Sequence, residues 1–331
     1  MRPGILLLIA LFYLQGTQGQ TVHQVDAVGI TVPDMNRALD FFTRVLPFEK
    51  ISETELYGTP YEKLKGVFGI RYKKVRLRLG DEEIELTDFL TSGGRAIPED
   101  SRSNDLWFQH LAIVVSNMDS AYARLKKYNV QHVSTEPQRL PKSIPQAEGV
   151  EAFYFRDPAG HNLELIYFPP GKGDPKWQHH ADRIFLGIDH TAIGISKTET
   201  SRNFYNNLLG MKQLGESYNT GTEQEHLNNV EGAHLHISGN KALGGMGVEF
   251  LEYVKPGPGR LYPADERADD LIHYETIMLT SDAEALYVKL KKEKIRLISP
   301  EVIQLPKSDY GYQKGFYARD PDGHVIGFFQ K

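Results

Sequence analysis

The segment FQHLAIVVSNMDSAYARLKKY, residues 108–128, consists of a strand-like run that leads directly into a short amphipathic helix. In the second part, Ala121, Leu125 and Tyr128 recur at helical spacing on one face. A polar residue able to cap the helix stands between the two parts. Three other segments have the same plan, and they cover residues 25–46, 188–210 and 273–293.

Each of these segments is followed by an extended stretch, a long polar loop and two more strand-like runs. The closing runs are EEIELTDF (82–89), HNLELIYF (161–168), GVEFLEYV (247–254) and GHVIGFF (323–329). The repeated unit is therefore one strand, one helix and three strands. Four such units predict an α+β fold made of four βαβββ modules.

The four modules are in register with one another. We compare the third residue of each opening strand with the matching residue of each closing strand. The opening positions are Ala27, His110, His190 and Glu275, and the closing positions are Glu85, Glu164, Glu249 and Gly327. These positions shift by 163 to 165 residues between the two halves of the chain, which indicates a duplicated pair of modules. We expect a first domain at 21–170, a second at 185–331, and a Pro- and Gly-rich linker at 171–184.

Histidine and glutamate occupy several of these matching positions. A carboxylate in the middle of a buried strand is costly unless it has a partner. His110 and His190 lie at matching positions of the opening strands, so they could bind the same ion as the glutamates. The chain contains no cysteine, and imidazole with carboxylate suits Zn, Ni, Mn, Co or Fe(II). The sequence therefore predicts one divalent metal ion held by His and Glu.

The fourfold unit resembles a known superfamily. The HLAI start at His110, the DPAGHNLEL run from Asp157 and the DPDGH run from Asp320 are similar to those of the vicinal-oxygen-chelate superfamily. Its members include glyoxalase I, methylmalonyl-CoA epimerase, extradiol dioxygenases and the bleomycin and fosfomycin resistance proteins. The resemblance implies two half-open barrels formed by pairs of modules. It also implies that each active cup binds one divalent metal through a His or Gln and a Glu or Gln from each module.

Two pairings of the modules are compatible with this resemblance. If consecutive modules pair, the candidate ligands are Glu85, His110 and Glu164 in one cup and His190, Glu249 and Glu275 in the other, with His273 as a substitute for Glu275. If the second and third modules pair, one cup holds His110, Glu164, His190 and Glu249. The other cup then has Ala27 and Gly327 where ligands belong. This second pairing places both losses in one cup, which favours it.

The resemblance favours an enzyme but leaves three functions open. The first is a lyase or isomerase that transfers a proton on a small oxygenated substrate, with Glu164 or Glu249 as the catalytic base. The second is an extradiol-type Fe(II) dioxygenase that uses two His and one Glu. The third is a binding protein that sequesters a small molecule without turnover.

The composition and the first residues bear on partners and location. The chain has 331 residues, with 38 basic against 43 acidic side chains, and this mild acidity argues against a nucleic-acid partner. Residues 1–19 combine Arg2, an apolar run and small residues before Gln20, which predicts a cleaved signal peptide. We therefore expect a secreted or periplasmic monomer that acts on a small molecule and has no membrane anchor after cleavage.

Overall fold

A computed structural model describes residues 21–179, 183–306 and 311–331. The predicted signal peptide at 1–19 and part of the predicted linker lie outside these residues. Within the described ranges, no helix is both long enough and apolar enough to cross a bilayer.

The first two modules contain the following elements. The first has β1 (Val22–Thr31), α1 (Met35–Asp40), the π-helical turn η1 (Phe41–Val45), β2 (Glu49–Tyr57), α2 (Thr59–Lys65), β3 (Arg71–Leu79) and β4 (Glu82–Phe89). The second has β5 (Gln109–Val115), α3 (Met118–Lys127), β6 (Gln131–His132), β7 (Gln138–Arg139), β8 (Glu151–Arg156) and β9 (Asn162–Tyr167), followed by the 3-10 turn η2 (Pro175–Gln178).

The last two modules repeat this order. The third has β10 (Phe185–Ile195), α4 (Thr198–Arg202), the π-helical turn η3 (Asn203–Leu208), β11 (Lys212–Thr220), α5 (Thr222–Asn228), β12 (His234–Lys241), β13 (Gly244–Gly245) and β14 (Gly247–Lys255). The fourth has β15 (Tyr274–Thr280), α6 (Ala283–Lys292), β16 (Ile303–Gln304), β17 (Lys314–Arg319) and β18 (Val325–Gln330). The α+β architecture of four strand–helix–strand modules predicted from the sequence is confirmed.

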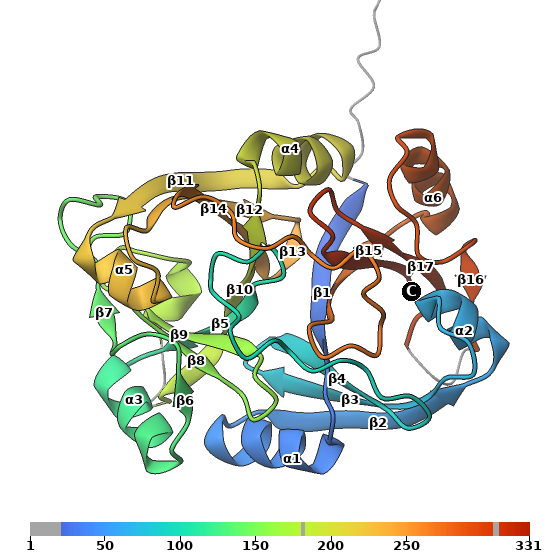
Figure 1. Cartoon of the computed structure of the whole chain (residues 1–331), viewed down its shortest axis with the longest axis horizontal. Helices are drawn as coiled ribbons and strands as arrows, with labels where there is room; N and C mark the ends of the chain where they lie inside the picture. Colours follow the sequence, from blue (N-terminus) through green and yellow to red (C-terminus); the bar gives the residue numbers. More distant parts are fainter. Residues whose placement is uncertain (1–20, 180–182, 307–310) are drawn as a thin grey trace, which may run out of the picture.

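The strands form two nine-stranded sheets, and each sheet draws on modules from both halves of the chain (Figure 1). One runs β11-β12-β14-β10-β5-β9-β8-β6, with β7 also paired with β8, and combines the second and third modules; we call its concave side the inner cup. The other runs β16-β17-β18-β15-β1-β4-β3-β2 and combines the first and fourth modules, with the two-residue strand β13 of the third module paired with β1; its concave side is the outer cup. Of the two pairings left open by the sequence, the structure has the crossed one.

In both sheets the two modules meet through their opening strands. β10 pairs with β5, and β1 pairs with β15, in each case antiparallel. Within every module the closing strand lies parallel to the opening strand. Four neighbouring strands therefore bring the opening and closing positions of two modules to the middle of one sheet.

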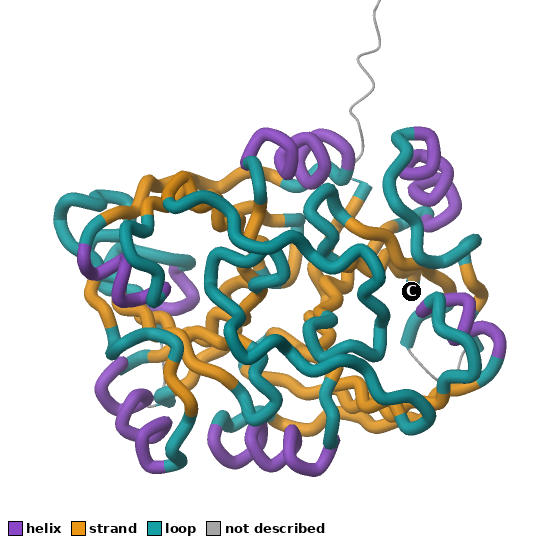
Figure 2. Tube along the Cα trace, in the orientation of Figure 1, coloured by secondary structure: helices purple, strands orange, loops and turns teal. Residues whose placement is uncertain are grey.

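Two long connections make the crossing possible. The first strap, residues 90–108, follows β4, and the second strap, residues 256–273, follows β14; both are loop segments in the middle of Figure 2. Arg95 of the first strap donates to Asp270 of the second (Nη2 to Oδ2, 2.6 Å), and Arg260 of the second donates to Asp105 of the first (2.8 Å). Both aspartates are buried, so this reciprocal clasp fixes the straps against each other.

The two sheets share one hydrophobic core. Its buried residues come from all four modules, for example Val28, Leu111, Ile193 and Phe328. Each concave side has smaller apolar clusters of its own. Because alternate residues of a strand face opposite sides, the opening strands send one set of side chains to the shared core and the other set into a cup.

Helices α2 and α5 differ from the long polar loop expected in each module. Both have seven residues, begin after a glycine with positive φ (Gly58 and Gly221) and end at a left-handed residue. Leu64 and Leu227 on these helices are buried against the two cups. Helices this short carry too few turns for their apolar period to stand out in the sequence.

The clasp between the straps leaves no space at Gly94. A Cβ atom there would lie 1.7 Å from the carbonyl oxygen of Asp269, whereas nothing lies within 4 Å of a Cβ at Gly93. We expect Gly94→Ala to lower the free energy of unfolding by about 1–3 kcal/mol and Gly93→Ala to change it by less than about 0.5 kcal/mol. Urea unfolding of the two variants measures this difference, and equal stabilities would contradict the close approach of the straps.

Candidate metal centre

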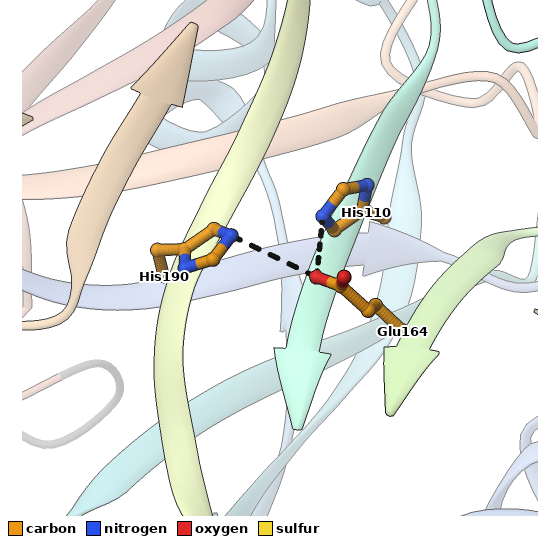
Figure 3. A group of neighbouring side chains, drawn as sticks. All are labelled: His110, Glu164 and His190. Atoms are coloured by element: carbon orange, nitrogen blue, oxygen red, sulfur yellow. Dashed lines mark ion pairs between the residues drawn. The ribbon is translucent and has the colours of Figure 1, made fainter. Parts of the chain in front are cut away.

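Three buried side chains converge in the inner cup from three neighbouring strands. His110 comes from β5, Glu164 from β9 and His190 from β10, and one ligand atom of each lies within 4.8 Å of the other two. Oε2 of Glu164 is 3.1 Å from Nε2 of His110 and 3.8 Å from Nε2 of His190. Figure 3 shows both imidazole rings turned toward this carboxylate. The strand order explains the convergence, because β10, β5 and β9 are adjacent.

Glu249, the fourth predicted ligand, lies at the edge of this group. It comes from β14, and its Oε2 is 3.4 Å from Nε2 of His190. Its side chain is 25% exposed, compared with 6% for Glu164. The structure thus brings all four predicted residues of the crossed arrangement into one cup, but it places the two carboxylates in different environments.

The free ring nitrogens of this group fit a cation. Both ring nitrogens of His110 and Nε2 of His190 are buried and make no hydrogen bond among the described residues, which is costly for polar atoms unless something binds them. Ligand atoms held about 2.0–2.2 Å from one metal ion stand a little over 3 Å apart, close to the separations observed here. Two imidazoles with carboxylates also suit a divalent metal chemically.

Asp189 orients His190 from behind. Its Oδ2 lies 2.9 Å from Nδ1 of His190, and its Oδ1 accepts a hydrogen bond from the Trp177 indole (2.6 Å). Neighbouring strand residues normally point to opposite faces, but the β10–β5 register shifts between Ile188 and His190, so a bulge brings Asp189 to the same side. A carboxylate on Nδ1 leaves Nε2 free to face the centre.

The charges around His190 are dominated by carboxylates. Burial disfavours the imidazolium, but Glu249 and Asp189 outweigh burial and raise the pKa of His190 well above its usual value. The same pairing lowers the pKa of Asp189 although burial acts in the opposite direction. The inner cup therefore favours a positive charge at this place.

A cavity of about 450 Å³, open to solvent on one side, reaches the centre. Glu164, His190 and Glu249 line it, whereas His110 lies behind them with no exposed surface. Much of the remaining wall is apolar, with Leu140, Val150, Ile166 and Phe168 among its residues. A cavity of this size and lining can hold a small organic molecule beside the four residues.

The outer cup has lost this arrangement. Ala27 and Gly327 occupy two of the four matching positions, and the two remaining carboxylates are paired with buried lysines. Lys74 contacts Glu85, and Lys65 contacts Glu275. An ammonium group thus neutralises each carboxylate that a metal would otherwise neutralise.

Two of the sequence-based ligand sets are therefore wrong. Glu85 lies in the outer cup, away from His110 and Glu164, and Glu275 lies there away from His190 and Glu249. His273, the proposed substitute, bridges Glu266 (2.6 Å) and Glu275 (2.8 Å). Both ring nitrogens of His273 are paired with these two carboxylates in the outer cup. His273 therefore does not join His190 and Glu249 as a metal ligand.

The sequence analysis missed the residues that distinguish the two cups. Asp189 precedes a predicted ligand, but only the bulge reveals that it faces the same way. Lys74 stands on β3 in a run with four other basic residues, RYKKVRLRL, which resembles an exposed strand. The buried position of Lys65 depends on α2, which was expected to be loop.

The ion pair in the outer cup gives a pH-dependent stability. Burial alone would raise the pKa of Glu275, but Lys65 and His273 outweigh it and lower this pKa well below its usual value. The ionised carboxylate thus stabilises the fold above about pH 4.5, and this contribution is lost as the pH falls. Lys65→Met removes the partner and should cost about 3–5 kcal/mol at pH 7, with a smaller loss at pH 4. Urea unfolding at both pH values measures the two losses.

A double variant controls for the volume of the side chains. Lys65→Met with Glu275→Leu replaces the pair by apolar groups and should recover most of the stability lost in the single variant. A loss in Lys65→Met that is the same at pH 7 and pH 4 would contradict the role of the ionised carboxylate.

Comparison with known proteins identifies the architecture. The 2-epi-5-epi-valiolone epimerase of an Actinomyces species is 32% identical over 158 residues, which cover 44% of this chain and 80% of that protein. The uncharacterised protein YwbC of Bacillus subtilis is 29% identical over 144 residues, covering 44% of this chain and 97% of that protein. The crystal structure of glyoxalase I from Zea mays superposes with a TM-score of 0.62 over 93% of this chain and 92% of that chain, at 16% identity.

A family model matches the chain twice. Residues 24–165 and 187–328 both fit the model described as Glyoxalase/Bleomycin resistance protein/Dioxygenase superfamily. The two matches cover most of the chain and follow the duplication seen in its sequence. The chain therefore belongs to the Glyoxalase/Bleomycin resistance protein/Dioxygenase superfamily, as a member with two tandem copies of the family domain.

Proposed function

We propose that the chain is a metal-dependent enzyme that transfers a proton on a small oxygenated substrate in its inner cup. One observation carries this proposal. Two imidazoles, whose Nε2 atoms make no hydrogen bond among the described residues, lie within 4 Å of a buried carboxylate, and a second, more exposed carboxylate borders the cavity. The first three residues have the character of ligands, and the fourth has the position of a base.

His110, His190 and Glu164 would hold the divalent metal, with Glu249 beside them. When bound, such an ion acts as a Lewis acid that polarises a substrate oxygen and acidifies the neighbouring C–H bond. The apolar wall formed by residues such as Ile166 and Phe168 limits the access of water to the bound substrate.

Glu249 is the better of the two candidate bases. Its carboxylate lines the cavity and is 25% exposed, so an oxygen of Glu249 can take a proton from a carbon of the bound substrate. Glu164 is more deeply buried and lies 3.1 Å from His110, which suits a fixed ligand. Delivering the proton to the neighbouring carbon, the former carbonyl carbon, gives isomerisation, and loss of a neighbouring group gives a lyase reaction.

The relatives support this class of reaction without defining the substrate. One relative at 32% identity over 44% of this chain is named an epimerase. The glyoxalase I structure is similar in fold at 16% identity. The predicted signal peptide at residues 1–19 further leads us to propose that the enzyme is secreted or periplasmic and meets its substrate outside the cytoplasm.

An Fe(II) dioxygenase is the second candidate function. His110, His190 and Glu164 alone form a set of two histidines and one carboxylate, which is the ligand set of many non-haem Fe(II) oxygenases. Oxygen uptake by the Fe(II)-loaded chain with a panel of catechols tests this alternative. Uptake that survives Glu249→Gln would favour it over proton transfer.

Metal content tests the crossed ligand set. The chain purified without chelator should contain about one divalent ion per molecule, and His190→Ala should contain none, because it removes a ligand from the single complete cup. Glu275→Gln changes the matching position of the outer cup and should keep the metal. Elemental analysis of the three proteins gives the result. Metal retained in His190→Ala would overturn the assignment.

Proton transfer is tested by isotope exchange. We expect the metal-loaded chain in D₂O to exchange the proton next to the carbonyl of a hydroxyketone or related compound, as followed by NMR. Glu249→Gln keeps the shape of the side chain and should lower the exchange rate about 10²–10⁴-fold, while metal content stays unchanged. Exchange at the parental rate in Glu249→Gln would rule out this base. Tight ligand binding with no exchange by the parent would instead favour the binding protein.

A further inference from the structure

Three buried amide side chains form a chain at the wall of the inner cup. Nδ2 of Asn219 on β11 donates to Oε1 of Gln224 on α5 (2.9 Å), and Nε2 of Gln224 donates to Oδ1 of Asn228. All three side chains are at least 97% buried, and Asn219 and Gln224 line the cavity. At the cavity end of the chain, Oδ1 of Asn219 makes no hydrogen bond among the described residues.

The outer cup shows that the fold does not need these amides. β2 and β11 have the same burial pattern with a single buried residue, which is Leu56 in one strand and Asn219 in the other. On the helices that follow, Tyr61 and Lys65 occupy the positions of Gln224 and Asn228. A buried amide with an unpartnered atom costs stability. Its presence only in the cup that has the candidate metal ligands therefore points to a role in binding.

The charges of the cavity wall limit the ligand. Four carboxylates line it: Glu164, Asp189, Glu216 and Glu249. Apart from the candidate ligand His190, the one basic side chain in the described lining is Lys172, and its ammonium is held by the carbonyl oxygens of Pro145 (2.7 Å) and Gln146 (3.2 Å). Away from the metal ligands, the wall therefore carries more negative than positive side chains, and this disfavours a carboxylate or phosphate at the far end of the substrate.

We propose that Asn219 and Gln224 form a hydroxyl-binding subsite and that the substrate is a neutral polyhydroxylated carbonyl compound. Oδ1 of Asn219 is a free acceptor among the described residues, and each of the two amide nitrogens has a second N–H, so a hydroxyl group can donate to the first and accept from the second. The metal-bound end of the substrate would carry the carbonyl, while the far end would place hydroxyl groups against the amides. This inference rests on the proposed function and adds the class of substrate to it.

Binding of four related ketones to the metal-loaded chain tests the subsite. Hydroxyacetone, 1,3-dihydroxyacetone and erythrulose differ in the number of hydroxyl groups, and dihydroxyacetone phosphate carries an anion. Calorimetry should show affinity that rises about 2- to 10-fold with each added hydroxyl group, as expected for one hydrogen bond. Dihydroxyacetone phosphate should bind at least 10-fold more weakly than dihydroxyacetone. Equal affinities, or tighter binding of the phosphate, would overturn the proposal.

Two variants assign the effect to the amides. Asn219→Leu copies the residue of the outer cup, and Gln224→Met removes both polar atoms at similar volume. Each variant should abolish the increase in affinity from dihydroxyacetone to erythrulose. The affinity for hydroxyacetone and the metal content should stay unchanged. Asn207→Leu, at an exposed position of η3, is the control and should keep the gain. A gain that persists in both amide variants would refute the subsite.

The outcomes separate this inference from the function on which it rests. A parent chain that binds no metal, or that exchanges no proton, contradicts the proposed function. A parent chain that binds metal and exchanges protons but shows no preference for hydroxyl groups contradicts only the hydroxyl subsite.

Discussion

The reciprocal clasp between the two straps is the constraint on which the rest of the molecule depends. Arg95 and Arg260 each reach across to a buried aspartate of the other strap, Asp270 and Asp105. The backbones also pair there, since Leu271 donates to Arg95 and Leu106 donates to Arg260. These contacts carry the second module toward the third and the fourth toward the first. Without this crossed pairing of modules, His110 and His190 would belong to different sheets and could not bind the same metal ion.

The two cups show two ways to balance carboxylates in the middle of a sheet. In the outer cup Lys65 and Lys74 supply the positive charge from within the chain, and aromatic residues such as Tyr317 and Tyr72 fill the remaining space. In the inner cup, Glu164 faces two imidazoles and forms no ion pair with a lysine of the described chain, and Nε2 of each ring makes no hydrogen bond there. The first solution gives a closed, stable packing, whereas the second leaves a place for a cation and a ligand.

The repeat, the α+β fold and the four residues of the inner cup could be predicted from the sequence. The register of the repeats was sufficient to identify these four residues. Glu164 and Glu249 stand at matching positions of the closing strands, and the two histidines stand at matching positions of the opening strands. The pairing of modules could only be favoured, because both pairings satisfy the same local periodicity. The contacts that decide it join residues about 155–175 positions apart and leave no period in the sequence.

Other features depended on local geometry that the residue pattern does not carry. Asp189 reaches His190 through a bulge, and the bulge is defined only by the pairing of β10 with β5. Lys65 and Asn228 occupy equivalent positions on α2 and α5, and helices this short show no recognisable apolar periodicity in the sequence. Long-range pairing and short helices are thus the two sources of error here, and both concern context rather than composition.

The core shared by all four modules links the fate of the two cups. Because the shared core joins both sheets, unfolding of either half-barrel exposes apolar surface of the other, and this couples the stabilities of the two. The inner cup carries unsatisfied polar atoms that weaken it, while the outer cup is densely paired and packed. Through this core, the stability of the outer cup supports an inner cup that keeps buried polar atoms without hydrogen bonds, and an isolated half-barrel would have to bear that cost alone.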